Sequence, residues 1–136
     1  MGVNAALALQ RAMVAHLRAD ASLALMLGGP HVYDEPPANQ KPPYVTVAGI
    51  ETRDWSAMDG RGAEHMVTLH VWSLKRGRKE AQTIVGAIDD RLDNAPLYPD
   101  GHRLVNLRTL FWTALPEPDG ERTRGLMRLR AVTEPL

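Results

Sequence analysis

Histidine and acidic side chains are the first groups in this sequence that could do chemistry. Five histidines could bind a metal ion, but no two of them have the i, i+4 spacing of a helical zinc site. His65 and His70 lie five positions apart in an expected strand, and an odd offset points two strand side chains to opposite faces. The chain has no cysteine that could complete a ligand set. We therefore expect no metal site.

A catalytic site is also weakly indicated. The sequence contains neither Gly-x-Ser-x-Gly, which presents a nucleophilic serine, nor Gly-x-x-x-x-Gly-Lys, which cradles phosphate. Asp89 and Asp90 are adjacent in an expected helix, so their side chains diverge by about 100° and cannot share a proton. We expect no catalytic residue and no cofactor.

Four basic side chains, Lys75, Arg76, Arg78 and Lys79, occur together between an expected strand and an expected helix. Positive charge at the start of a helix opposes the helix dipole, at a cost of roughly a few tenths of a kcal/mol. Two interpretations are open. The cluster is a solvated joint between the two elements, or it contacts phosphate or the acidic side chains of a neighbouring chain.

The overall composition limits the classes of function further. The 136 residues match one domain, and 16 basic and 16 acidic side chains give a formal net charge of zero. That balance argues against a dedicated nucleic-acid binder. No run approaches the roughly 18 apolar residues of a membrane span, and the start of the chain lacks the basic segment of a signal peptide. We expect one soluble domain over residues 1–136, made inside the cell, with no membrane partner.

Hydrophobic periodicity predicts two main helices. Apolar residues recur every three or four positions over residues 6–21 and again over residues 79–93. A shorter helical turn over residues 23–27 can be capped by Asp20 and Ser22, and Gly28-Gly29-Pro30 ends it. Four prolines between residues 34 and 43 predict a stiff surface loop.

Alternation and β-branched residues predict strands over residues 44–50, 64–73, 104–113 and 125–133. Asp59-Gly60 and Asp119-Gly120 provide turns that give each strand pair the spacing of a hairpin. The order helix, strands, helix, strands is typical of an α+β fold. We expect a mainly antiparallel β-sheet with two helices packed on one face.

The face of this sheet that points away from the helices is a second candidate site. Alternation predicts that Val105, Leu107, Thr109 and Phe111 face the helices, and that Leu104, Asn106, Arg108 and Leu110 face away. On the last strand, Arg128 and Arg130 share a side with Leu126 and Val132. Arginine beside large apolar groups favours a contact with another subunit, and a solvated face with scattered leucines is the alternative.

Trp55 and Met58 lie in the polar segment that joins the first two long strands. Apolar side chains near the tip of a long hairpin are poorly placed for the core of their own chain. They suit docking to a partner, and folding back onto the sheet is the competing interpretation.

The order of these segments resembles the tail-completion or tail-terminator proteins of long-tailed phages and phage-derived gene transfer agents. The resemblance covers almost the whole chain, from Ala-Asp-Ala-Ser-Leu-Ala-Leu-Met-Leu-Gly-Gly through His-Val-Tyr-Asp and Pro-Pro-Tyr-Val-Thr-Val. Its most specific part is Val-Trp-Ser-x5-Lys-Glu-Ala at residues 71–81. The closing Arg-Gly-Leu-Met-Arg-Leu-Arg-Ala-Val-Thr-Glu also fits.

This resemblance implies a structural role without catalysis. It implies a ring, commonly of six copies, on the head-proximal end of the tail tube, where the ring stops polymerisation and meets the head or its connector. The implied partners are further copies of the chain, the tail tube protein and the head–tail connector, with DNA passing through the channel without sequence-specific binding. The implied location is the neck region of a phage-like tail, after assembly in the bacterial cytoplasm.

The family supplies no catalytic residues, so the candidate site is an interface. It consists of Trp55, Met58, Lys75, Arg76, Arg78, Lys79, Arg108, Arg128 and Arg130. Two other functions stay open. A head–tail connector protein differs little at this level, and a small monomeric ligand-binding domain or enzyme would have a pocket between the sheet and the helices.

Overall fold

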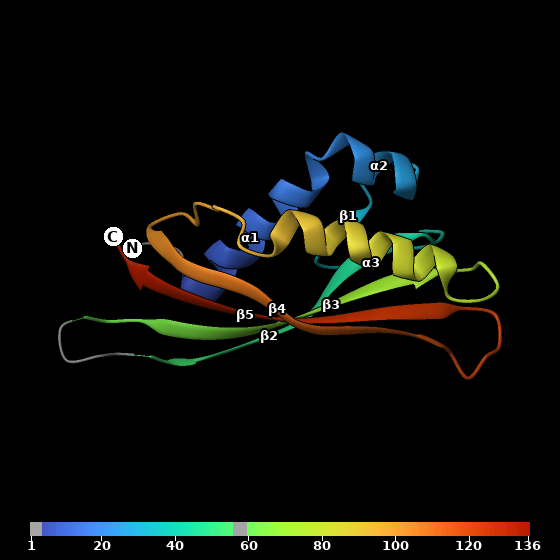
Figure 1. The fold of residues 1–136 in the computed structure, drawn as a ribbon. Coiled ribbons are helices and arrows are strands. Elements are labelled where there is room, and N and C mark those ends of the chain that lie inside the picture. Colours follow the sequence, from blue (N-terminus) through green and yellow to red (C-terminus); the bar gives the residue numbers. More distant parts are fainter. Residues whose placement is uncertain (1–3, 56–59) are drawn as a thin grey trace.

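A computed structural model describes residues 4–55 and 60–136 of the chain. Its five-stranded sheet has the order β1-β2-β3-β5-β4, and the three helices lie on one side of the sheet (Figure 1). The elements are α1 (Ala5–Arg18), α2 (Ala21–Leu27), β1 (Val32–Tyr33), β2 (Tyr44–Asp54), β3 (Ala63–Ser73), α3 (Lys79–Leu92), β4 (His102–Pro116) and β5 (Thr123–Pro135). The α+β prediction, a mainly antiparallel sheet with helices on one face, is confirmed.

The two N-terminal helices begin and end where the sequence supplies capping residues. Asn4 accepts a hydrogen bond from the Leu7 amide at 2.8 Å and starts α1. Asp20 does the same for the Leu23 amide at 2.8 Å and starts α2, which confirms the predicted short turn. Gly28 then adopts a left-handed φ of 78° that ends α2. None of the helices in the described part of the chain has the length and apolar content needed to span a bilayer.

The four long strands form two antiparallel hairpins that meet at the β3–β5 pair. In that pair Val67 lies opposite Leu129, and Leu69 lies opposite Met127. β1 is the single parallel strand among the described residues, and it pairs only with the start of β2. The strands extend beyond their predicted ends, because the polar residues that flank each apolar segment continue the ladder.

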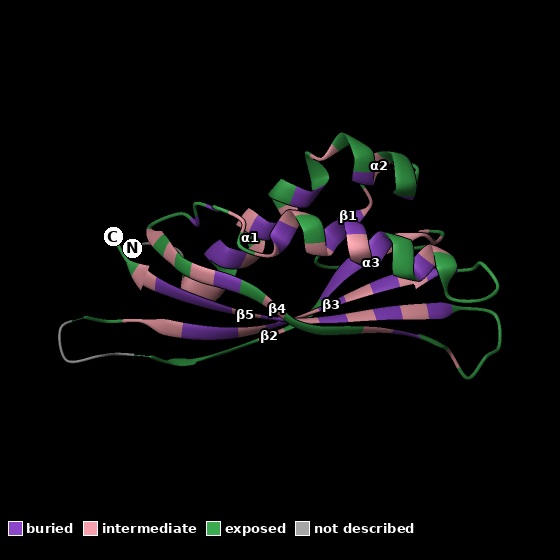
Figure 2. Cartoon of the chain, in the orientation of Figure 1, coloured by how far each residue is buried: buried purple, intermediate pink, exposed green. Residues whose placement is uncertain are grey.

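The core lies between the helices and the sheet, where buried residues line the facing surfaces (Figure 2). α1 contributes Leu9, Met13 and Leu17, and α3 contributes the predicted stripe around Ile84 and Ile88. The predicted alternation of β3 is confirmed by buried residues at Val67, Leu69 and Val71. Burying one such side chain contributes about 1.5–3 kcal/mol, so this layer holds the helices on the sheet.

A β-bulge near the start of β4 makes one part of the strand prediction wrong. The pairing with β5 shifts between Leu104 and Asn106, which leaves Val105 as the extra residue. Leu107 is buried and Arg108 is exposed, as predicted. Before the bulge the alternation is reversed. Val105 is therefore exposed instead of facing the helices, and Leu104, predicted to face away, packs against the core.

A second β-bulge in β4 reverses the prediction for Phe111. The pairing shifts again between Thr109 and Phe111, with Leu110 as the extra residue. Phe111 lies opposite Arg128 and is 53% exposed, so it faces away from the helices and not toward them.

The outer edge of β4 is occupied by groups from the region around α3. The backbone amide of Asn94 donates to the Leu107 carbonyl at 2.8 Å, and the Asp93 carboxylate accepts from the Thr109 amide at 2.9 Å. Further along the strand, Arg78 Nε donates to the Ala114 carbonyl at 3.1 Å. An open edge is a template for pairing with another strand, so these contacts disfavour extension of the sheet through β4.

Candidate functional site on the helix-free face

The helix-free face is the surface of the sheet opposite α1–α3, and alternate residues of the four long strands form it. On β3 these are Glu64, Met66, Thr68, His70 and Trp72, which lie opposite Val132, Arg130, Arg128, Leu126 and Arg124 of β5. β4 adds Asn106, Arg108, Phe111, Thr113 and Leu115 on the other side of β5. The face alternates arginine with aromatic and aliphatic groups, and its strands contain no lysine.

At one end of this face, a buried carboxylate holds two arginines over a tryptophan. Glu64 accepts from Arg53 Nε at 2.5 Å and from Arg130 Nε at 2.6 Å. These hydrogen bonds, first that from Arg130, hold the pKa of Glu64 below its ordinary value. The Trp55 ring lies 5.0 Å from the Arg130 guanidinium and 5.9 Å from that of Arg53, both within cation–π range. Trp55 thus folds back onto the sheet and still exposes 47% of its surface.

A similar cluster lies at the other end of the helix-free face, around Trp72. The guanidinium groups of Arg122 and Arg124 lie 4.9 and 5.9 Å from the centre of the Trp72 ring. Glu117 pairs with Arg124 at 3.0 Å. His70 meets the edge of the same ring at 5.8 Å, and burial, followed by the charge of Arg124, lowers the pKa of its imidazole. Both ends of the face therefore present indole rings fixed by arginine.

Arg128 lies between these clusters and has an unsatisfied group. Its Nε atom is buried and has no hydrogen-bond acceptor among the described residues. Its cross-strand neighbours are Thr68 and Phe111. An unsatisfied buried donor costs about 1–3 kcal/mol, so a rearrangement of the Arg128 side chain that brought this nitrogen to an oxygen atom of a partner would remove the cost.

Arg108 lies directly opposite Arg130, a cross-strand arrangement that is repulsive for like charges. Asp93 reduces that repulsion by accepting from Arg108 Nε at 3.1 Å. The hydrogen bond from the Thr109 amide, and then that from Arg108, lower the pKa of Asp93. The guanidinium of Arg108 is thereby held toward the edge of the sheet.

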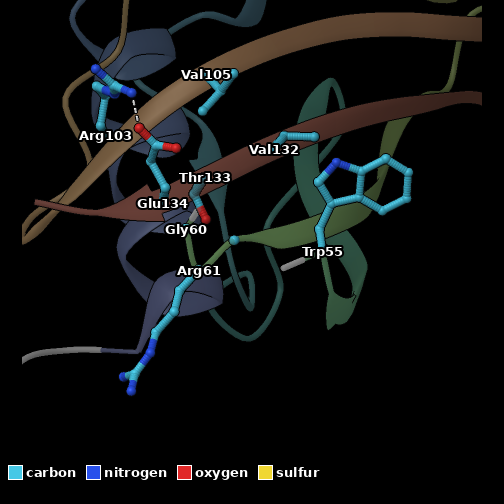
Figure 3. A pocket seen from close by; sticks show the side chains of 9 residues that line it. Trp55, Gly60, Arg61, Arg103, Val105, Val132, Thr133 and Glu134 are labelled. Carbon is cyan, nitrogen blue, oxygen red and sulfur yellow. Dashed lines mark ion pairs between the residues drawn. The ribbon is translucent and has the colours of Figure 1, made fainter. Parts of the chain in front are cut away.

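A hollow of about 420 Å³ adjoins Trp55 at the hairpin end of the sheet (Figure 3). Trp55, Val105 and Val132 form its apolar wall. Arg103 and Glu134 form an ion pair on its far side, shown by the dashed line. The hollow is open, and Arg61 also lines it.

The basic cluster at the start of α3 forms a separate surface on the helical side. Lys75, Arg76 and Lys79 are exposed, and no carboxylate of a described residue lies within 4 Å of their charged nitrogens. Arg78 differs, because its guanidinium bonds the Ala114 carbonyl of β4. In this cluster Arg78 is a structural joint, whereas the other three cations project into solvent.

Four of the nine predicted interface residues come together on the helix-free face: Trp55, Arg108, Arg128 and Arg130. The four residues of the basic cluster do not join them, and Met58 lies outside the described residues. The prediction missed Arg53, Glu64, Trp72, Arg122 and Arg124. Arg124 has the same even spacing as Arg128 and Arg130, which is a signal that the sequence contained. Nothing in the local pattern marked Arg53, since the chain there was predicted to be a loop.

Among residues 4–55 and 60–136, no three acidic or histidine side chains are grouped so that they could hold a metal ion. His65 is fully buried, and its two ring nitrogens each lie 2.8 Å from a threonine hydroxyl, of Thr52 and of Thr133. These contacts make His65 a structural residue near the turn end of the β2–β3 hairpin.

Comparison with known proteins relates almost the whole chain to one family and to one solved structure. No curated protein matches the sequence. A chain from the virion of the native gene transfer agent particle is similar at 32% identity and a TM-score of 0.88, and the match covers 97% of this chain and 99% of that chain. The family model for tail completion protein gp17 matches residues 11–134. The chain therefore belongs to the tail completion protein gp17 family and has a structural role in a phage-type tail.

Proposed function

We propose that the protein forms a closed ring on the head-proximal end of a tail tube, stops growth of the tube and joins it to the head or its connector. Membership of the tail completion family and similarity to a chain of a gene transfer agent virion support this role. The single structural observation that carries it is the helix-free face, where arginine and aromatic residues surround Arg128 and its unsatisfied buried nitrogen.

The composition of this face suits contact with protein better than contact with water. Arginine, tryptophan, phenylalanine and methionine are enriched in the centres of protein interfaces, and lysine and glutamate are depleted. Trp55 and Trp72 are already held in place by guanidinium groups, so docking against them orders few further rotamers. A second copy or a tube subunit that carries carboxylates would cover the face and pair with its arginines.

A closed ring needs two different surfaces on each subunit, because a head-to-tail contact joins unlike patches. The helix-free face is one such surface, and the helical side with the basic cluster offers another. A net charge of zero lets identical copies approach each other without strong repulsion. Six subunits of 15.0 kDa would give a ring of about 90 kDa. DNA would pass through such a ring without sequence-specific contacts.

Reversing the charge of Arg128 tests this proposal. Light scattering of the purified protein at high concentration should give about 90 kDa for the wild type and a far smaller mass for Arg128→Glu. Arg11→Glu is the matched control, because Arg11 is exposed on α1 and its replacement changes the net charge by the same amount. If Arg128→Glu kept the wild-type mass and circular dichroism spectrum, the helix-free face would not be the subunit interface.

A further inference from the structure

A groove on the helical side of the molecule combines an apolar floor with three cations. It lies between α2 and the start of α3 and has a volume of about 420 Å³. Met26 and Ile84 contribute apolar surface, and Lys75, Arg76 and Lys79 stand around it. This basic groove does not overlap the helix-free face, whose residues lie on the opposite side of the sheet.

The cations of the basic groove form no ion pair within the described part of their own chain. No carboxylate there lies within 4 Å of the charged nitrogens of Lys75, Arg76 or Lys79. Glu80 also lines the groove, but its carboxylate accepts the Ser73 hydroxyl at 2.6 Å. Three cations face the single carboxylate of Glu80, so the groove keeps an excess of positive charge that favours an acidic occupant.

The apolar part of the groove distinguishes a peptide from a phosphate backbone. Met26 is 40% exposed, and two leucines next to lining residues in the sequence, Leu25 before Met26 and Leu74 before Lys75, are 84% and 52% exposed. Phosphate groups would gain nothing from these side chains, whereas an acidic segment with apolar neighbours would bury them. The occupant predicted by this chemistry has at least two carboxylates next to apolar side chains.

Six of the fifteen carboxylates of the described residues are already engaged, and only two pairs of adjacent acidic residues occur in these ranges, Asp89–Asp90 and Asp34–Glu35. Ion pairs hold Asp20, Glu64, Asp93, Glu117, Asp119 and Glu134. The adjacent pair Asp89 and Asp90 lies on α3, where consecutive side chains diverge, and one oxygen of Asp89 is buried. Asp34 and Glu35 differ: both are exposed, no ion pair joins them to a described residue, and two prolines follow.

The loop that carries Asp34 and Glu35 is held in shape by its own hydrogen bonds. The Tyr33 hydroxyl donates to Gln40 Oε1 at 3.0 Å, and His31 Nδ1 lies 2.7 Å from the same hydroxyl. The backbone amide of Gln40 donates to the Pro37 carbonyl at 3.1 Å. Proline also restricts φ, so this loop loses little conformational entropy when it docks.

We propose that residues 34–37 of one copy dock into the basic groove of the next copy, where Asp34 and Glu35 meet Lys75 and Arg76. This inference rests on the self-association of the proposed ring and names one of its contacts. The loop follows β1 at an edge of the sheet, and none of residues 34–37 lines the groove, so the two surfaces share no residue. Such a head-to-tail contact can close into a ring.

A charge-swap experiment tests the contact directly. Sedimentation velocity over a concentration series at low and high salt would measure self-association of the wild type, Asp34→Lys/Glu35→Lys, Lys75→Glu/Arg76→Glu and the variant with all four changes. Each double variant should associate roughly tenfold more weakly than the wild type at low salt. The fourfold variant should recover the association, since its charges are again opposite. Arg11→Glu and Asp100→Lys are single charge reversals at exposed residues outside the loop and the groove, and they should behave as the wild type.

Three results would overturn this contact. The first is a fourfold variant that stays as weak as its parents, and the second is a wild type that remains monomeric at every concentration. The third is a Lys75→Glu/Arg76→Glu variant that self-associates as the wild type does but no longer binds a 20-base-pair DNA duplex. That result would show that the groove binds phosphate. Electron micrographs of wild-type protein on purified tail tubes test the tube-capping role separately. Capped tubes together with a failed charge swap would refute only the loop–groove contact.

Discussion

Gly125 in β5 lies where α3 packs closely on the sheet, and its replacement by alanine tests that packing. A Cβ atom at this position would lie 2.8 Å from Val85 Cγ2 on α3 and 3.2 Å from Val71 Cβ on β3. Both valines are fully buried, and β-branched side chains have few alternative rotamers. The extra methyl group can therefore be accommodated only if α3 moves away from the sheet.

Overpacking of this kind costs about 1–3 kcal/mol. In a domain of this size the cost corresponds to a fall in Tm of about 4–12 °C. Urea unfolding followed by circular dichroism would measure the change in the free energy of unfolding, and thermal unfolding would measure Tm. The matched control is Gly86→Ala in α3, where an added Cβ meets nothing within 4 Å. That variant should be more stable than the wild type, by up to about 1 kcal/mol, because alanine is a better helix former than glycine.

The two alanine variants should thus change stability in opposite directions. If Gly125→Ala were as stable as the wild type while Gly86→Ala was stabilised, α3 would not approach β5 as closely as described. The basic groove between α2 and the start of α3 would then lack its described shape, because that shape depends on the position of α3.

Three further predictions concern polar groups that stabilise the hairpins. Burial lowers the pKa of His65, so at acidic pH the unfolded chain binds a proton more readily than the folded chain does. The free energy of unfolding should therefore fall as the pH drops below 6.5. The urea midpoint should change less between pH 7.5 and pH 5 in His65→Gln than in the wild type. The pKa of Glu64 is lowered from 4.5, so its contribution is present above that pH and is lost as the pH falls through the lower value. Glu64→Gln should be less stable than the wild type at pH 7 and approach it toward pH 3, and a pH-independent difference would contradict the ion-pair account. Arg78→Ala should lower the free energy of unfolding, measured in urea, by about 1 kcal/mol, because the Ala114 carbonyl loses its donor. An unchanged urea midpoint would show that water replaces the arginine as donor.

Much of the fold could be predicted because its pattern is local. The alternation of β3 and the apolar stripe of α3 depend only on residues within each element, and both are confirmed. Asp20 and Gly28 marked the limits of α2 by capping chemistry. The two faces of β5 also followed from alternation, because β5 pairs without a bulge along β3.

The parts that could not be predicted depend on pairing between distant residues. The bulges at Val105 and Leu110 arise from the register with β5, and one extra residue exchanges the two faces of a strand. The Glu64 cluster joins residues 66 positions apart in sequence, Glu64 and Arg130. The contact of Trp55 with Arg130 likewise required the three-dimensional arrangement to distinguish docking at a hairpin tip from folding back onto the sheet.

The central claim is that this protein acts by covering the end of a tail tube, and tube growth measures that action most directly. Purified tube protein would be polymerised with the wild type, with Arg128→Glu or with no addition, and tube lengths would be measured in electron micrographs. We predict that the wild type shortens the tubes and leaves a density at one end, and that Arg128→Glu leaves the lengths unchanged. Tubes that grew to the same lengths with and without the wild type, with bare ends in both samples, would contradict the claim.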